Sequence, residues 1–258
     1  MRQKILLSEM SWPEISGYLK ENDCIIIPIG SIEEEGLHLP VNVDSLIALE
    51  IAKIVADRTK VIVAPLIPFG YSEWHMEYCG TISLMTETLI QVLREYCGSL
   101  ISHGFRKLVF FNPHIGNVAA ISQVGFEFRK KFGVLVTMAN IWGIIDKMGQ
   151  EVDKLSEKSF RHAGEMMTSM VLAFRPDLVD MTKAREGVEK PMLGESNNRA
   201  PGEILFHGYP IEVYQRTKET SNSGIMGNPT NATKENGEIL INKICEVLSN
   251  FINKIKLT

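Results

Sequence analysis

The sequence contains few cysteines, no excess of basic residues and no long apolar run, and each shortage excludes a class of protein. Its 258 residues include four cysteines, and no two of them form a C-x-x-C pair. This spacing predicts reduced, mostly buried thiols instead of a disulfide framework or a structural zinc site. The formal net charge is -4 and basic residues form no long run, so we expect no nucleic-acid partner.

Signals that direct a chain to a membrane are also missing. The first residues, Met-Arg-Gln-Lys-Ile-Leu-Leu-Ser-Glu, lack the long apolar segment of a secretory signal peptide. No stretch approaches the roughly 18 uninterrupted apolar residues that would span a bilayer. We therefore expect a cytoplasmic protein with no membrane partner. The ordinary composition, 45% hydrophobic and 22% charged, suits a single globular domain over residues 1–258.

Predicted strands and helices alternate along most of the chain. Unbroken apolar runs predict buried strands at residues 24–28, 61–65, 107–111 and 133–141. Apolar residues at helical spacing predict helices at about residues 45–58, 86–103, 118–132, 162–173 and 234–254. This alternation predicts an α/β fold, a three-layer αβα sandwich with a mostly parallel sheet. Residues from about 177 to 231 are rich in Gly, Pro, Asn and charge, which predicts long ordered loops near an active site or a subunit interface.

Acidic and imidazole side chains follow the predicted strands at the edge where such sheets bind ligands. The loop from Gly30 to Asp44 contains Glu33 and Glu35, and His114 follows the third strand in Asn-Pro-His-Ile-Gly-Asn. Consecutive glutamates more often form a solvated turn, and a lone histidine is more often structural. Carboxylates and an imidazole at one sheet edge would nevertheless suit Zn, Mn or Fe(II). Such a cation lowers the pKa of a bound water.

Other motifs are weaker. His162 opens a His-Ala-Gly-Glu stretch, where it could cap a helix or act as an acid or base. The methionines 166, 167 and 170 indicate core packing more than a metal site. A phosphate-binding G-x-x-x-x-G-K-[ST] loop, a G-x-S-x-G elbow and an H-E-x-x-H helix are all missing from the sequence.

At these residues the sequence resembles the creatininase family, and the resemblance spans nearly the whole chain. The family pattern G-S-x-E-Q-H-G-x-H-L-P is similar to residues 30–40, and Asp44 follows it. Further blocks are similar at residues 68–75 and 80–84, at 112–117 around His114, at 162–169, and at 223–229. Five blocks in the right order imply a creatininase-like α/β fold.

The resemblance also implies a divalent-metal centre, with zinc, manganese or iron as the cofactor. Carried over by position, Glu33 and His114 bind one metal and Asp44 bridges toward a second. Glu35 stands where the family motif has a histidine, and is the expected fourth ligand. Met167 stands where the family has a glutamate. With these two changes we expect one metal site, and the sequence does not decide whether a second metal binds.

The resemblance implies that the protein hydrolyses a C–N bond in a cyclic amide or formamide-like small molecule by means of a metal-activated water. His162 would move a proton to the leaving group, and Ser72, His75 and Trp142 would line the substrate pocket. Residues 159–161, Ser-Phe-Arg, occupy the stretch in which creatininase is expected to contact its substrate. Creatinine itself is therefore not the expected substrate.

Two other functions stay open at this point. Family relatives include hydrolases of cyclic polyol ketones, so C–C hydrolysis is one alternative. Glu35 and Met167 favour the other, a catalytically altered member that binds a metabolite or serves in an assembly. The resemblance also implies a homo-oligomer, with a hexamer as the family's habit.

Overall fold

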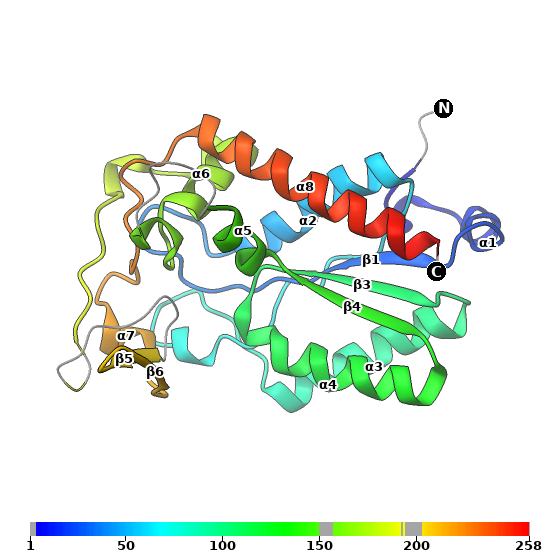
Figure 1. Ribbon diagram of the computed structural model, residues 1–258, viewed down its shortest axis with the longest axis horizontal. Helices are drawn as coiled ribbons and strands as arrows, with labels where there is room; N and C mark the ends of the chain where they lie inside the picture. Colours follow the sequence, from blue (N-terminus) through cyan, green and yellow to red (C-terminus); the bar gives the residue numbers. More distant parts are fainter. Residues whose placement is uncertain (1–3, 150–156, 192, 194–202, 258) are drawn as a thin grey trace.

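The centre of the protein is a parallel four-stranded sheet (Figure 1), seen in a computed structural model that describes residues 4–149, 157–191, 193 and 203–257. Its strands are β1 (Cys24–Pro28), β2 (Ile62–Val63), β3 (Lys107–Asn112) and β4 (Leu135–Asn140). They lie in the order β2-β1-β3-β4, and every pairing is parallel. All five residues of β1 are buried, as expected for a strand covered on both faces.

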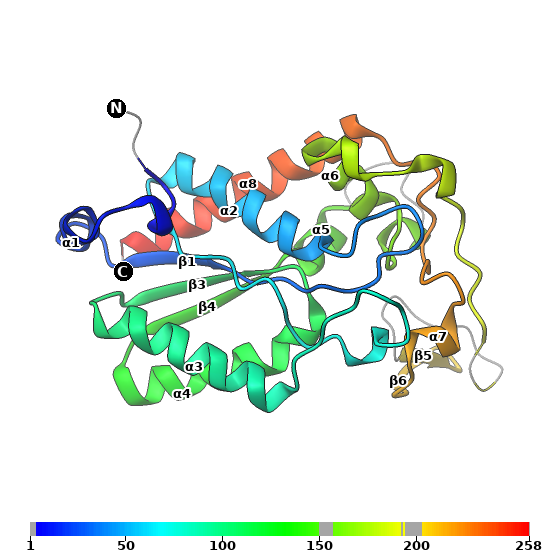
Figure 2. The ribbon, with the colours of Figure 1, turned by 180° about the vertical axis from the view of Figure 1, so that it is seen from behind.

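Helices cover both faces of this sheet (Figures 1 and 2). On one face lie α2 (Val43–Thr59), α5 (Ile141–Gly149), α6 (Glu165–Phe174) and α8 (Lys234–Lys256). On the other lie α3 (Thr86–Ser102) and α4 (Val118–Phe132). Alternate side chains of β1 enter two separate cores: Ile26 packs with the first group of helices and Ile27 with the second. The predicted three-layer αβα architecture is confirmed.

Helix α8 crosses α6 at very short range. A Cβ atom added to Gly237 would lie 1.9 Å from the backbone oxygen of Ser169, so only glycine permits this approach. The start of α8 is bound to the same residue, since the Thr233 N–H donates to the Ser169 hydroxyl over 3.1 Å. The C-terminal helix thus supports α6 from behind.

Most predicted elements differ from the structure by only a few residues, but β2 is shorter than predicted and several elements were not predicted. Helix α6 begins at Glu165 instead of residue 162, because Ala163 has a φ of 54° and Gly164 takes the N-cap position. Helix α1 (Trp12–Leu19) and α5 were missed. Further short 3-10 helices are Leu7–Glu9, Glu73–His75, Ile115–Asn117, Glu157–Phe160, Pro176–Leu178 and Met181–Lys183.

The range from 177 to 231, expected to form long loops, contains regular structure in its described part. A hairpin pairs β5 (Glu203–Phe206) with β6 (Tyr209–Glu212), and a short helix, α7 (Thr217–Thr220), follows. Residues 192 and 194–202 of this range lie outside the described residues.

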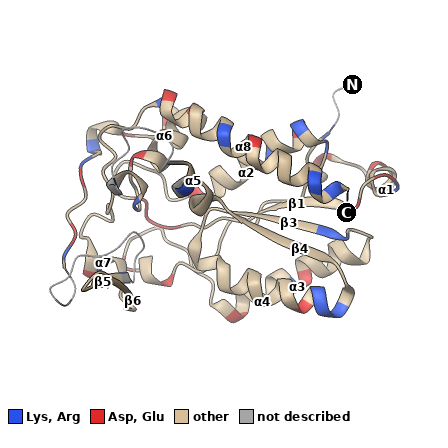
Figure 3. Cartoon of the chain, in the orientation of Figure 1, with Lys and Arg blue, Asp and Glu red and all other residues tan. Residues whose placement is uncertain are grey.

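The remaining features of the fold are the distribution of its charged residues, the state of its cysteines and the apolar character of its helices. Figure 3 shows acidic and basic residues interspersed along the outer helices. Cys24, Cys97 and Cys245 are buried free thiols and Cys79 is exposed, which confirms the prediction of reduced, mostly buried cysteines. Over the described residues, none of the helices has both the length and the apolar character that crossing a membrane requires.

Candidate metal centre and substrate pocket

Three segments deliver acidic and imidazole side chains to one edge of the sheet. Glu33 follows β1, Asp44 lies in the first turn of α2, and His114 follows β3. Strands β1 and β3 are paired in register up to Pro28 and Phe111, so their carboxyl ends release both loops at the same place. All three side chains are buried, with exposures of 2–3%.

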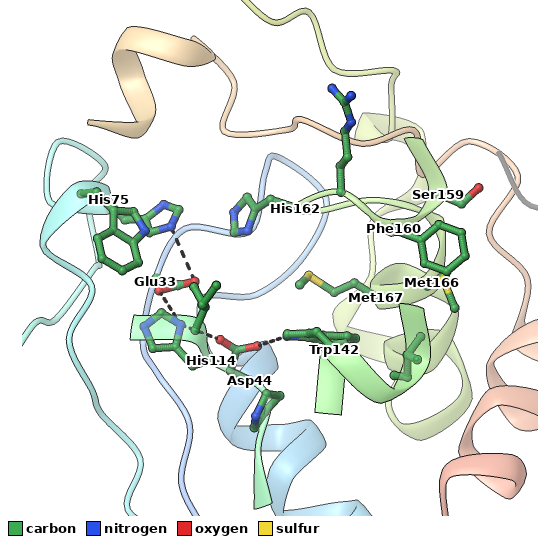
Figure 4. Close-up of a pocket in the computed structure, with 15 residues that line it drawn as sticks. Glu33, Asp44, His75, His114, Trp142, Ser159, Phe160, His162, Met166 and Met167 are labelled. Carbon is green, nitrogen blue, oxygen red and sulfur yellow. Dashed lines mark hydrogen bonds and ion pairs between the residues drawn. The ribbon is translucent and has the colours of Figure 1, made fainter. Parts of the chain in front are cut away.

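The His114 ring directs one nitrogen at both carboxylates (Figure 4). Its Nδ1 lies 3.3 Å from Oε2 of Glu33 and 3.2 Å from Oδ2 of Asp44. Its Nε2 lies 2.7 Å from the Tyr71 carbonyl oxygen, so Nε2 can donate there and leave Nδ1 for the carboxylates. One ligand atom from each of Glu33, Asp44 and His114 lies within 4.8 Å of the others. This group is called the first triad below.

Further donors hold the carboxylates of the first triad in place. The Ser72 hydroxyl donates to Glu33 Oε2 over 2.7 Å. The Ser31 hydroxyl donates to Asp44 Oδ2 over 2.9 Å, and the Trp142 indole N–H donates to Asp44 Oδ1 over 3.2 Å. Such outer contacts orient the ligands of metal sites. Ser72 and Trp142, predicted to contact substrate, therefore also contact the carboxylates.

Electrostatics require a positive charge between these groups. Burial alone would lower the pKa of His114, but the charge of Glu33 and hydrogen bonds to Asp44 and Glu33 raise it well above its ordinary value. Burial also opposes ionisation of Glu33, whereas the charges of His114 and His75 hold the pKa of that carboxyl below its usual range. Both buried carboxylates face the His114 ring, at a position where a divalent cation could bind in place of a proton on that ring.

A second group of potential ligands consists of Glu33, His75 and His162. The Nε2 atom of His75 lies 3.6 Å from Oε1 of Glu33. The two histidine rings are 4.8 Å apart between centroids. This second triad shares Glu33 with the first, so both groups meet on one carboxylate.

Glu34, which sequence reasoning missed, orients both histidines of the second triad. Its Oε1 lies 2.9 Å from His75 Nδ1 and 3.1 Å from His162 Nε2. Its Oε2 accepts the backbone N–H of Gly36 over 3.0 Å. Burial raises the pKa of Glu34, but His162 and His75 outweigh it and bring the pKa down to about 2. The signal available in the sequence was a glutamate in place of the glutamine of the family motif.

Glu35 belongs to neither triad but lies close to His162 of the second. It is 1% exposed, its Oε2 lies 3.5 Å from His162 Nε2, and neither carboxylate oxygen has a hydrogen-bond partner. Burial raises the pKa of this carboxyl well above its ordinary value. Neither group of potential ligands among the described residues includes Glu35, so its role as a fourth ligand stays a prediction.

A pocket opens beside the first triad (Figure 4). His75 and Trp142, predicted to contact substrate, line it together with His162, whereas Ser72 is not among the lining residues that the structure describes. One side of the pocket, called the apolar wall, consists of Trp142, Ile145, Phe160, Met166 and Met167, all in one core cluster. The two methionines were expected only to pack in the core. They do so, but they also face the pocket.

The fold and this sheet edge define an α/β protein with a candidate metal centre. The sequence model of the family described as Creatininase: Creatinine amidohydrolase matches residues 8–252. The chain belongs to the creatininase family of hydrolases, which confirms the resemblance seen in its motifs.

Named relatives in this family carry several activities. The chain is 26% identical over 264 residues to the creatinine amidohydrolase of Pseudomonas putida, covering 95% of this chain and 94% of that protein. It is 32% identical over 223 residues to the mycofactocin precursor peptide peptidase of Mycobacterium tuberculosis, covering 83% and 78%. It is 29% identical over 265 residues to the 3-dehydro-scyllo-inosose hydrolase of Thermotoga maritima, covering 97% and 83%.

Solved structures agree with this placement. A zinc–zinc form of a creatininase variant superposes with a TM-score of 0.79 at 25% identity, covering 98% of this chain and 99% of that chain. A manganese creatininase superposes with the same TM-score of 0.79 at 24% identity. The structural neighbours therefore include both Mn and Zn forms.

Proposed function

We propose that this protein is a metal-dependent hydrolase that opens a C–N bond in a cyclic amide or formamide-like small molecule. The observation that carries the proposal is the first triad, in which Glu33, Asp44 and His114 bring ligand atoms within 4.8 Å of one another. The relative named creatinine amidohydrolase, 26% identical to this chain, supports the choice of a C–N bond.

The donor set fits a divalent cation. Two carboxylates and one imidazole suit zinc, manganese or iron(II), and each carboxylate is held by a further hydroxyl or indole donor. Glu33, Asp44 and His114 would hold the ion. When bound, such an ion lowers the pKa of a water molecule and polarises a carbonyl group.

His162 is the residue we propose to carry a proton to the leaving nitrogen. Burial would lower its pKa, but Glu35 and Glu34 raise it well above its ordinary value, so the imidazolium form is available as an acid. Its Nε2 is held by the backbone oxygen of Glu34 at 2.9 Å and by the carboxylate at 3.1 Å. His75 and Trp142 would position the substrate, and Ser72 would act by holding the carboxylate of Glu33.

The experiment combines metal analysis with a substrate screen. Protein reconstituted with Zn or Mn should retain about one ion per chain through the first triad and hydrolyse members of a set of lactams and formamides. Asp44→Asn should lose the ion and the activity. Asp180→Asn, which changes an exposed carboxylate that accepts a backbone N–H in a surface turn, serves as the matched control. A chain that retains no stoichiometric metal after reconstitution refutes the proposal.

The same metal-reconstituted protein can be used to test two alternative functions. The Thermotoga maritima relative, named as a hydrolase of 3-dehydro-scyllo-inosose, supports C–C hydrolysis of a cyclic polyol ketone, so cyclic ketones belong in the screen. Glu35 and Met167, at positions where the family motifs have histidine and glutamate, support a catalytically altered member. Such a member would bind metal without turning over any of these compounds.

Our proposal includes a homo-oligomer, up to a hexamer, that acts on a small molecule. Light scattering on the purified chain measures the mass of the assembly. A monomeric mass at micromolar concentration would contradict this part of the proposal.

A further inference from the structure

We propose that the apolar wall selects the substrate, so that, of the two proposed classes, the preferred substrate is a cyclic amide with an aliphatic or aromatic group on the carbonyl side, and not a formamide. This inference rests on the proposed function and narrows its substrate class. It concerns the side of the pocket away from His75, where Met167 and Trp142 face the first triad in Figure 4.

The composition of the apolar wall favours an apolar group. Met167 lies in α6 at the position where the family motif has a glutamate, and it is 8% exposed. A thioether is only a weak acceptor and carries no charge. Met166 and Ile145 lie beside it in the same buried cluster, with exposures of 2% and 1%. Because these side chains are packed from behind, the wall is a fixed apolar surface.

Three polar side chains near the apolar wall each make a contact with another residue. The Trp142 indole N–H donates to Asp44 over 3.2 Å. The Ser159 hydroxyl donates to Glu165 over 2.8 Å, and Arg161 forms an ion pair with Glu189. A hydroxyl-rich substrate placed against this wall would have to break these contacts or bury its hydroxyls without partners, at a cost in binding. This disfavours a polyol ketone.

The size of the pocket limits the apolar group. The pocket has a volume of about 150 Å³, and an apolar cavity of about 150 Å³ can hold a benzene molecule. Because the amide group must share this volume beside the first triad, we expect a substituent no larger than a phenyl ring or a short alkyl chain. Burying each methylene of that chain should tighten binding by about fourfold.

The test uses hydroxamic acids, whose head group binds divalent metals and whose tail would extend along the apolar wall. Acetohydroxamate, butanohydroxamate, hexanohydroxamate and benzohydroxamate are titrated into the zinc-reconstituted protein by calorimetry. We expect affinity to rise from acetohydroxamate to hexanohydroxamate, by about fourfold for each methylene that is buried. A 4-hydroxybutanohydroxamate should bind at least about tenfold more weakly than hexanohydroxamate, because it lacks one methylene and the terminal methyl and buries a hydroxyl instead.

Variants locate the effect at the wall. Met167→Glu should reduce hexanohydroxamate affinity by at least about tenfold and change acetohydroxamate affinity little, because only the longer tail reaches the wall. Met167→Leu should keep the steep series. Met85→Glu adds the same charge at a residue that is 60% exposed and outside the pocket lining, and should leave the series unchanged.

The outcomes separate the two proposals. A flat or falling wild-type series, with acetohydroxamate still bound, overturns the apolar selection and leaves the hydrolase proposal standing. Loss of metal binding, with no hydroxamate bound, overturns the hydrolase proposal itself. Should Met167→Glu fail to fold by circular dichroism, the wild-type series and Met167→Leu still decide the question, because a steep slope in both supports the inference.

Discussion

Replacing Glu35 by methionine should stabilise the metal-free protein. The Glu35 carboxylate is 1% exposed and neither of its oxygens has a hydrogen-bond partner. Attraction to His162 lowers its pKa, but burial and the charges of Asp44, Glu33 and Glu34 prevail and raise that pKa. A buried polar group without a partner costs about 1–3 kcal/mol. Methionine has a similar length without that cost, although it also removes the ion pair with His162 at 3.5 Å, so the free energy of unfolding should rise by at most that amount.

The gain should depend on pH with a definite sign. Because the pKa of Glu35 is raised in the folded state, the native chain binds this proton more tightly than the unfolded chain does. The stability that this proton contributes is complete below the ordinary value of 4.5 and is lost as the pH rises through the folded pKa. The methionine variant has no such loss. Its advantage over wild type should therefore widen as the pH rises above 4.5.

The assay is urea and thermal unfolding of chelator-treated protein. At pH 7 the expected gain corresponds to a rise in Tm of roughly 2–12 °C for a domain of this size. Glu165→Met is the matched control. Glu165 is also buried, at 7% exposure, but its carboxylate accepts from Ser159 over 2.8 Å and from Asn236 over 3.4 Å. Removing that acceptor should destabilise the chain. Equal or lower stability of Glu35→Met at pH 7, or a gain independent of pH, would refute the reasoning.

Three further predictions follow from the site and the fold. Trp142→Phe removes the indole donor to Asp44 and should weaken metal affinity by about 10–100-fold, measured by calorimetry; an unchanged affinity would contradict the role of this contact. Metal affinity should fall by up to about tenfold per pH unit on acidification, because the cation must displace the proton that His114 holds with raised pKa; a pH-independent affinity would show that no such proton is displaced. Gly237→Ala places a Cβ 1.9 Å from the Ser169 oxygen and should lower the free energy of unfolding by about 1–3 kcal/mol. Chemical denaturation would measure that loss, and a neutral effect would mean that α6 and α8 separate easily.

The strand ends and the loops that carry the first triad could be predicted from the sequence, because each buried strand is recognised from its own run of apolar residues. Strand β1 is a run of five buried residues, and such a run is recognised without knowing its neighbours. Once the sheet is parallel, the loops after β1 and β3 must meet at one edge. The pattern thus predicts that these loops meet, whereas the choice of Glu33, Asp44 and His114 within them came from the resemblance to the family motifs.

The rest depended on features that leave little trace in hydrophobic pattern. All four residues of β6 are exposed, so no alternation marks the hairpin. Its turn uses His207 and Gly208 with φ values of 51° and 85°, the conformation of a tight hairpin turn. The left-handed Ala163 before α6 is likewise rare for a residue with a Cβ. Glu34 contacts both His75 and His162. These histidines come from loops that are far apart in the sequence, so sequence order does not show that they meet.

The close crossing of α6 and α8 has a consequence for how the protein is made. Helix α6 carries Met166 and Met167 of the apolar wall, and Gly237 of α8 lies against its backbone. Helix α8 is the last helix of the described chain to be synthesised. A chain in which α8 has not yet been made lacks this backing, so we expect the proposed apolar wall to form only after that helix has been synthesised.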